Sequence, residues 1–139
     1  MINHLKPYID RLRLSGLRPT KQRLAICKVL FDRKDTFHFT IEKLKKKIEK
    51  NVTGKISLAT VYNTVHSFKK NGYLKEIPMN CNQIYFDTNI SHHHHFFDLS
   101  TNQLLDMKDS DVGNIKIKKN IPGKKIKSIE VLVKIANNN

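Results

Sequence analysis

The sequence predicts an α+β fold, in which an N-terminal winged helix-turn-helix over residues 1–87 precedes a small α/β dimerisation domain over residues 88–139. Three observations predict this division. Apolar residues recur every three or four positions up to about residue 71, which is the spacing of helices packed on a core. Beyond residue 87, apolar and polar residues alternate, as they do in strands. The first part carries 18 Lys and Arg against 7 Asp and Glu, and the second part carries 8 against 5.

Local signals delimit three helices in the first part. Ser15-Gly16 ends the first helix, because glycine favours the backbone conformation that closes a helix. Thr20 can cap the second helix, which is expected to continue to Asp32. Thr40 can cap the third, whose outer face carries several lysines, a pattern that is typical of a solvated surface.

A fourth helix is expected from about Leu58 to Asn71, with Ser57 as its cap and Gly72 at its end. Its apolar positions should pack on the earlier helices, and they are Val61, Val65 and Phe68. The other positions are expected to face outward, and they are Thr60, Tyr62, Asn63, Thr64, Lys69 and Lys70.

Two short strands follow the fourth helix. They are expected over residues 73–77 and 84–87, joined by a turn over residues 78–83. Helices followed by a hairpin make a winged helix-turn-helix, whose last helix enters the major groove of DNA with the hairpin beside it.

The second part of the chain, residues 88–139, is expected to form strands. Strands are expected at residues 95–99 and 103–107, and apolar and polar residues alternate at residues 115–117 and 129–135. A segment this short buries too little apolar surface to be stable alone, so pairing with a second copy is the expected remedy.

Four consecutive histidines, His92 to His95, lie at the start of the second part. In an extended chain His93 and His95 share one face, and His92 and His94 share the other. Each imidazole pair suits a borderline metal ion, and short histidine tracts are associated with metal binding. The alternative is a polar loop that is merely rich in histidine.

Charge and cysteine content narrow the classes of protein. A strongly basic first part favours nucleic-acid binding, although the excess is mostly lysine, which AT-rich coding alone would favour. Cys27 and Cys81 are single and far apart, so neither a disulfide framework nor a thiolate zinc clamp is supported. With no signal peptide and no apolar run of about 18 residues, the protein is expected to be soluble and cytoplasmic, with no membrane partner.

Three sequence features resemble the ferric uptake regulator (Fur) superfamily: the segment 17–23 (LRPTKQR), His38 before the third helix, and the segment 57–63 (SLATVYN). Asn63 stands where most of the superfamily has Arg, and residues 85–89 lead directly into the histidines. Both departures are similar to the iron response regulator (Irr) branch, which responds to haem.

The resemblance implies a transcriptional repressor of iron homeostasis that binds a double-stranded, AT-rich operator as a homodimer. Its regulatory metal site would use His38, Asp87, His93 and His95, with iron, manganese or zinc as the ion. Three imidazoles and a carboxylate suit these ions and discriminate poorly among them. Because the ligands come from both predicted domains, a bound ion would fix the angle between the domains and the spacing of the two reading helices.

The resemblance leaves a second metal site and haem open. His92 and His94 match the first two ligands of a second family site, but Gly113 lies where a glutamate belongs. In the Irr branch the histidine run is tied to haem, so residues 92–95 are candidate axial ligands. The Cys-Pro haem motif of some relatives is absent, because Cys27 precedes Lys28 and Cys81 precedes Asn82.

The expected DNA contacts fall on two helices. Tyr62 offers a ring to thymine methyl groups, Asn63 could bond adenine, and Thr60 could assist or bond phosphate. Residues at the start of the second helix suit phosphates or a minor groove, and they are Arg18, Lys21, Gln22 and Arg23. In the alternative, Tyr62 only packs against the wing.

Three other functions fit parts of the pattern. A metal-dependent hydrolase could use His93, His95 and Asp87, but it would also need a general base, for which the sequence offers no partner. A Fur-type regulator could sense manganese, zinc or peroxide instead of haem. A basic structural DNA-binding protein would show steep salt dependence and little sequence preference.

Overall fold

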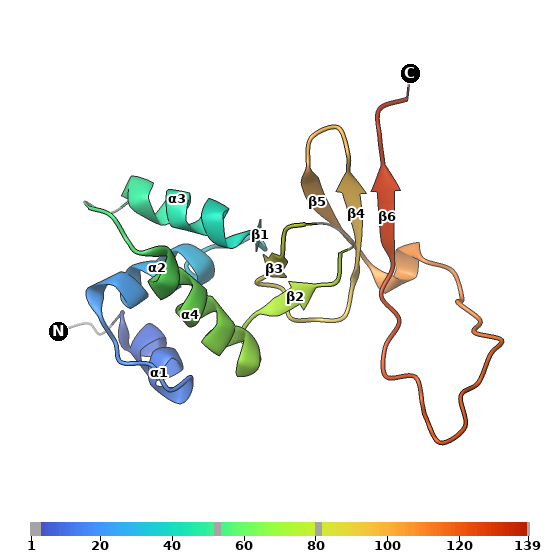
Figure 1. Ribbon diagram of the computed structural model, residues 1–139, viewed down its shortest axis with the longest axis horizontal. Helices are drawn as coiled ribbons and strands as arrows, with labels where there is room; N and C mark the ends of the chain where they lie inside the picture. Colours follow the sequence, from blue (N-terminus) through green and yellow to red (C-terminus); the bar gives the residue numbers. More distant parts are fainter. Residues whose placement is uncertain (1–3, 52–53, 80–81, 139) are drawn as a thin grey trace. The chain divides into compact units, whose positions relative to one another are not determined.

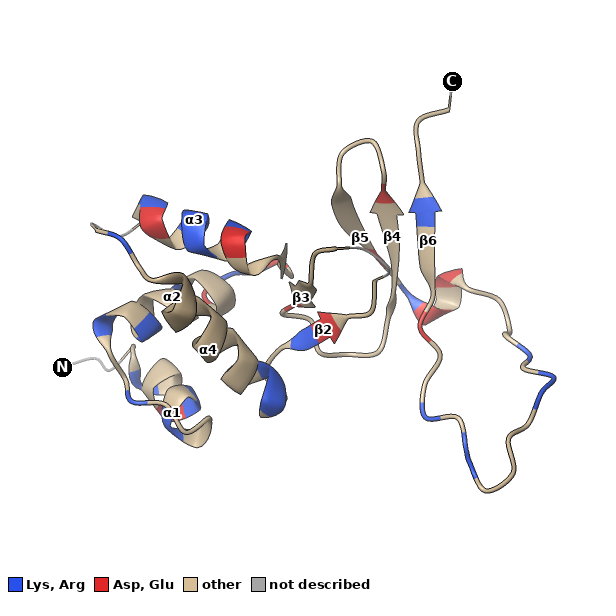
Figure 2. Cartoon of the chain, in the orientation of Figure 1, with Lys and Arg blue, Asp and Glu red and all other residues tan. Residues whose placement is uncertain are grey.

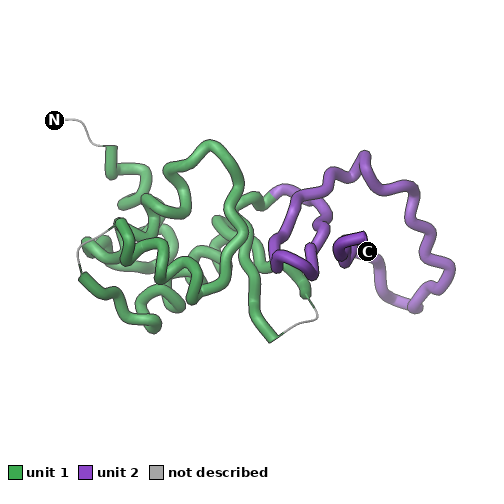
Figure 3. The backbone as a smooth tube through the Cα atoms, turned by 90° about the horizontal axis from the view of Figure 1, so that it is seen from above, with its two compact units in different colours: residues 1–90 green, residues 91–139 purple. Residues whose placement is uncertain are grey.

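A computed structural model of the chain describes residues 4–51, 54–79 and 82–138. The chain divides into two compact units, residues 1–90 (unit 1) and residues 91–139 (unit 2), which Figure 3 colours separately. The functional division at residue 87, into a DNA-binding and a sensing domain, stays a prediction.

The described part of unit 1 contains four α-helices, and their bounds are α1 Lys6–Leu14, α2 Lys21–Phe31, α3 Ile41–Asn51 and α4 Leu58–Lys70 (Figure 1). The predicted caps form, because the side-chain oxygens of Thr20, Thr40 and Ser57 each accept a backbone N–H three residues on, at 3.1–3.2 Å. Gly16 and Gly72 follow α1 and α4 with φ of 77° and 82°, the left-handed conformation that the sequence predicts there.

A small antiparallel sheet completes unit 1. It is made of β1 His38–Phe39, β2 Lys75–Ile77 and β3 Tyr85–Asp87, in the order β1-β3-β2. The hairpin β2–β3 was expected, whereas β1 was not. The expected turn at residues 78–83 includes residues 80 and 81, which lie outside the described part of the chain.

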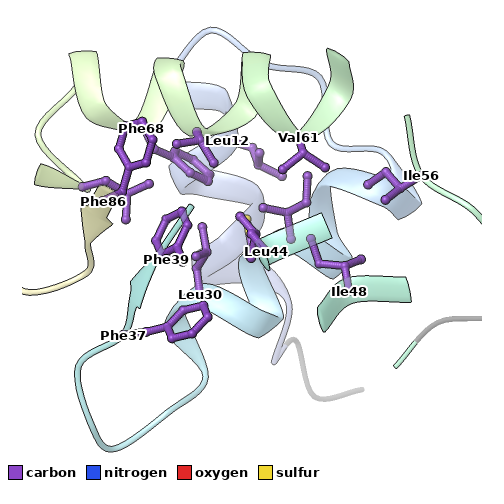
Figure 4. Packing of buried hydrophobic residues seen from close by; sticks show 14 residues of the cluster. Leu12, Leu30, Phe37, Phe39, Leu44, Ile48, Ile56, Val61, Phe68 and Phe86 are labelled. Atoms are coloured by element: carbon purple, nitrogen blue, oxygen red, sulfur yellow. The ribbon is translucent and has the colours of Figure 1, made fainter. Parts of the chain in front are cut away.

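The core of unit 1 is built from the apolar faces of the helices and from β1 and β3 (Figure 4). Val61, Val65 and Phe68 of α4 are fully buried, as predicted. Thr64, expected to face outward, is also buried, and its hydroxyl donates to the Thr60 carbonyl at 2.7 Å. The prediction for Thr64 was therefore wrong. The side chain can be buried because this bond within the helix satisfies its hydroxyl.

Unit 2 is a three-stranded sheet. Its elements are β4 His94–Asp98, β5 Gln103–Met107, the 3-10 turn η1 Asp109–Asp111 and β6 Leu132–Ile135, with the strand order β5-β4-β6. β4 pairs with β5 antiparallel and with β6 in parallel. Residues 112–131 form neither helix nor strand, so the prediction of a strand at residues 115–117 was wrong. None of the helices in the described ranges is long and apolar enough to cross a bilayer.

Candidate metal-binding and DNA-binding residues

His38 and Asp87, two of the predicted metal ligands, face each other across β1 and β3. They are partners in the strand register, and His38 Nε2 lies 3.2 Å from Asp87 Oδ2. The Asp87 side chain is fully buried, and its other oxygen accepts the backbone N–H of Asn89 at 2.8 Å. This hydrogen bond orients the carboxylate, so one oxygen is directed at the imidazole.

The other two predicted ligands, His93 and His95, lie together at the start of β4. Both are buried, with ring centroids 4.5 Å apart. Asp106 of β5 is the register partner of His95, and one of its oxygens lies 3.2 Å from His93 Nε2 and 3.4 Å from His95 Nε2. Asp106 was not predicted as a site residue, because its proximity depends on the register of two strands.

The hydrogen bond at His93 Nδ1 defines which nitrogen is available to a metal. Nδ1 lies 2.7 Å from the carbonyl oxygen of Ser91, which can only accept, so Nδ1 carries the proton. In the neutral ring, Nε2 then presents a lone pair toward the Asp106 carboxylate. The Asp106 oxygen lies 3.2 Å from Nε2, and a ligating histidine held by a backbone carbonyl is the usual arrangement at metal sites.

His92 and His94 form a second group with Asp109 on the opposite side of the histidine run. The backbone N–H of Val131 donates to His94 Nδ1 at 3.0 Å, so the proton of that ring is on Nε2, which donates to Asp109 at 2.6 Å. His92 lies 3.2 Å from Asp109 and 3.0 Å from the carbonyl of Ile129. These contacts, that of His92 first, lower the pKa of Asp109 below its ordinary value.

This second group offers less to a metal than the first, although its ligand atoms lie within 4.8 Å of one another. Both nitrogens of His94 are already engaged by hydrogen bonds, so neither presents a lone pair to an ion. The group instead attaches the chain before β6 to β4, because His92 and His94 bond the backbone at residues 129 and 131.

The start of α2 and the start of α4 form a polar groove in unit 1. Five of the predicted DNA-contacting residues line it, together with Thr20, and they are Arg18, Lys21, Gln22, Arg23 and Thr60. The Arg23 guanidinium donates to the carbonyl of Arg18 at 2.9 Å, which holds both residues at the groove. In Figure 2, Lys and Arg recur over the helices of unit 1, as binding to phosphates requires.

Tyr62 and Asn63, the predicted base-reading residues, lie in the first half of α4 and are exposed. The Tyr62 side chain is 49% exposed, and its ring lies on His66 with the centroids 4.0 Å apart. Asn63 lines a second groove, which shares Arg23 with the first and is also lined by Lys69 and Lys70. The Thr60 hydroxyl is bonded to Ser57 at 2.7 Å, which gives it a role in the helix cap.

Comparison with known proteins gives a consistent result. The sequence model of the ferric uptake regulator family matches residues 14–135. The ferric uptake regulation protein of Rhizobium leguminosarum bv. viciae is 32% identical over 98 residues, which cover 70% of this chain and 67% of that protein. The peroxide-responsive repressor PerR of Staphylococcus aureus (strain Mu50) is 28% identical over 114 residues, which cover 82% of this chain and 75% of that protein.

Solved structures share the fold. The Vibrio cholerae ferric uptake regulator matches with a TM-score of 0.67 at 21% identity, over 93% of this chain and 98% of that chain. The Pseudomonas aeruginosa ferric uptake regulator with manganese matches with a TM-score of 0.65 at 17% identity, over 95% and 98%. The predicted α+β fold is confirmed by these likenesses.

Proposed function

The chain belongs to the ferric uptake regulator family, and from this membership we propose that it is a dimeric repressor whose DNA binding is controlled by a divalent metal ion. Members of the family are DNA-binding transcriptional regulators, so the hydrolase alternative is set aside. The observation that carries the metal proposal is the single Asp106 oxygen within 3.4 Å of both His93 and His95. A cytoplasmic location follows from this function, because the partner is chromosomal DNA.

The proposed ligands are the four predicted from the sequence together with Asp106: His38, Asp87, His93, His95 and Asp106. The pairing of β1 with β3 in unit 1 brings His38 and Asp87 together. The pairing of β4 with β5 in unit 2 separately brings Asp106 to His95. Imidazole and carboxylate donors suit iron, manganese or zinc. The family resemblance implies that one ion draws on both pairs of ligands, and such an ion would favour one spacing of the paired reading helices.

Haem is the competing signal, and the Irr branch assignment depends on it. A haem iron needs an unengaged ring nitrogen with open space around it. His94 has both nitrogens bonded and is buried, and His93 and His95 are buried against Asp106. Of the four histidines only His92 is exposed, and its two ring nitrogens lie against Asp109 and the carbonyl of Ile129. The hydrogen bonding therefore favours a divalent ion over haem.

The proposed partner is AT-rich operator DNA, read by α4 from two copies of the chain. Tyr62 and Asn63 would contact base edges, and the polar groove at the start of α2 would contact phosphates. Dimerisation is supported by unit 2, where Leu105, Phe96 and Val133 form a row across the three strands in register. Leu105 and Val133 are 48% and 37% exposed, an apolar strip of the kind that a second copy covers.

One titration tests the proposal. Duplexes are first selected from a random pool by the protein with Mn(II), and metal-free protein is then titrated anaerobically with Mn(II), Fe(II) or haem. Mn(II) or Fe(II) is expected to strengthen binding to the selected duplex by at least about tenfold, the size of a typical allosteric coupling. A response to haem alone would support the Irr branch instead. A response to nothing, with no preference among sequences, would support a structural DNA-binding protein.

A further inference from the structure

β1 and β3 form a strand pair with two chemically different faces. In the register, His38 pairs with Asp87 and the next pair is Phe39 with Phe86. Because successive side chains of a strand point to opposite faces, the ligand pair is on one face and the phenylalanine pair is on the other. The phenylalanine rings are fully buried and stacked, with centroids 5.6 Å apart.

The phenylalanine face contacts an aromatic side chain of α4, His66. His66 and Phe86 form a T-shaped pair, with centroids 6.0 Å apart and the rings nearly perpendicular at 80°. The opposite neighbour of His66 is Tyr62, one helical turn earlier, with the rings 4.0 Å apart. His66 is thus the element of unit 1 that lies between the buried strand pair and the exposed base-reading ring.

His66 is an unusual residue for this position. Its Nε2 is buried and has no hydrogen-bond partner, although an unpaired buried polar atom is destabilising. A ring held by two aromatic contacts, with no hydrogen bond at Nε2, can follow a shift of either neighbour. An apolar residue would fill the same space without burying an unpaired polar atom. The flat shape of the ring is therefore the property that needs explanation.

We propose that Phe86 and His66 transmit occupancy of the His38–Asp87 ligand pair to Tyr62, which makes His66 a positioning residue for DNA reading. This inference depends on the proposed function, because it requires that His38 and Asp87 bind the ion. A metal ion held by His38 and Asp87 would join the two strands through these side chains, which already lie 3.2 Å apart. Such a bridge would limit the relative motion of β1 and β3, and Phe86, then His66, then Tyr62 would occupy a narrower range of positions.

The test compares the operator affinity with and without Mn(II), expressed as a ratio, in four proteins. They are the wild type, His66→Leu, His66→Phe and the neighbouring control Ser67→Ala. His66→Leu keeps the apolar volume and removes the flat ring, whereas His66→Phe keeps the ring and removes the unpaired nitrogen. The ratio is expected to fall by about three- to tenfold in His66→Leu, the worth of an aromatic pair, and to stay near the wild-type value in His66→Phe and Ser67→Ala.

Mn(II) stoichiometry and the circular dichroism spectrum are measured for each protein. A lower ratio in His66→Leu, with the stoichiometry and helix content of the wild type, would support the inference, because a protein that had lost its fold would not keep either. A His66→Leu ratio equal to the wild-type ratio would overturn the inference and leave the proposed function intact. A wild type that binds no Mn(II), or whose operator affinity does not change with it, would instead reject the proposed function. If His66→Leu does not fold, the ratio is measured in Phe86→Leu instead. A lower ratio than in the wild type supports the inference, and an equal ratio overturns it.

Discussion

Asp106 shows how one carboxylate can organise two imidazoles. It lies opposite His95 on the neighbouring strand and contacts the ring of His93 as well. The sequence could not identify it, because only the register of β4 and β5 shows that Asp106 lies opposite His95. The histidines themselves were identified because their alternation is a local property of the chain.

Removing the Asp106 carboxylate is expected to weaken metal binding. Asp106→Asn keeps the size of the side chain but removes its negative charge, and the affinity for Mn(II) should fall by at least about tenfold, as for other groups that support metal sites. Isothermal titration of the metal-free protein measures the affinity. Asp111→Asn in the nearby 3-10 turn is the control, and an equal loss in both variants would contradict a ligand role for Asp106.

Asp109 gives a pH-dependent contribution to stability. Hydrogen bonds from His92 and then His94 lower its pKa below the ordinary value of 3.8. A carboxylate with a depressed folded-state pKa stabilises the fold above the unfolded-state pKa, and this contribution is lost as the pH falls through the folded-state value. The metal-free wild type should therefore lose thermal stability below about pH 4 more steeply than Asp109→Asn. Parallel melting-temperature curves for the two proteins would contradict this prediction.

At the scale of elements, the helices could be predicted because their signals are local. Thr20, Thr40 and Ser57 identify the helix starts, and each cap forms. β1 could not be predicted, because a strand of two residues exists only through its partner β3, far along the chain. The strand expected at residues 115–117 does not form, since Ile115 and Ile117 find no neighbouring strand in the described part of unit 2.

Tyr62 of α4 is expected to read the DNA sequence. Tyr62→Ala should weaken binding to the selected duplex by roughly tenfold, the cost of about one lost base contact, while binding to random duplex changes little. Gel-shift titrations against both duplexes give the two affinities. Equal losses on the two duplexes would show that Tyr62 acts on general DNA affinity or on folding.

Lys21, at the start of α2, is the contrasting case. A phosphate contact carries no sequence information, so Lys21→Ala should weaken binding to both duplexes alike. The slope of log affinity against log salt concentration should fall by about one in magnitude. Fluorescence anisotropy at a series of salt concentrations measures that slope, and an unchanged slope would exclude a phosphate contact.

At the scale of the whole molecule, the two units differ in what they expose. Unit 1 has a closed apolar core and carries the DNA-contacting candidates, whereas unit 2 exposes an apolar strip. Leu105→Glu places a charge in that strip and is expected to shift the protein from dimer toward monomer in sedimentation equilibrium. The matched control is Gln103→Glu on the same strand, and a dimer that is unaffected by Leu105→Glu would place the dimer contact elsewhere.

The central claim is that imidazoles at the start of β4 detect a metal ion and thereby set the affinity for DNA. The most direct measurement compares operator affinity with and without Mn(II) in the wild type and in a variant with His93→Ala and His95→Ala. The account predicts a strong metal response in the wild type and none in the variant, with binding of metal-free protein to random duplex retained in both. A variant that responds to Mn(II) as the wild type does would contradict it.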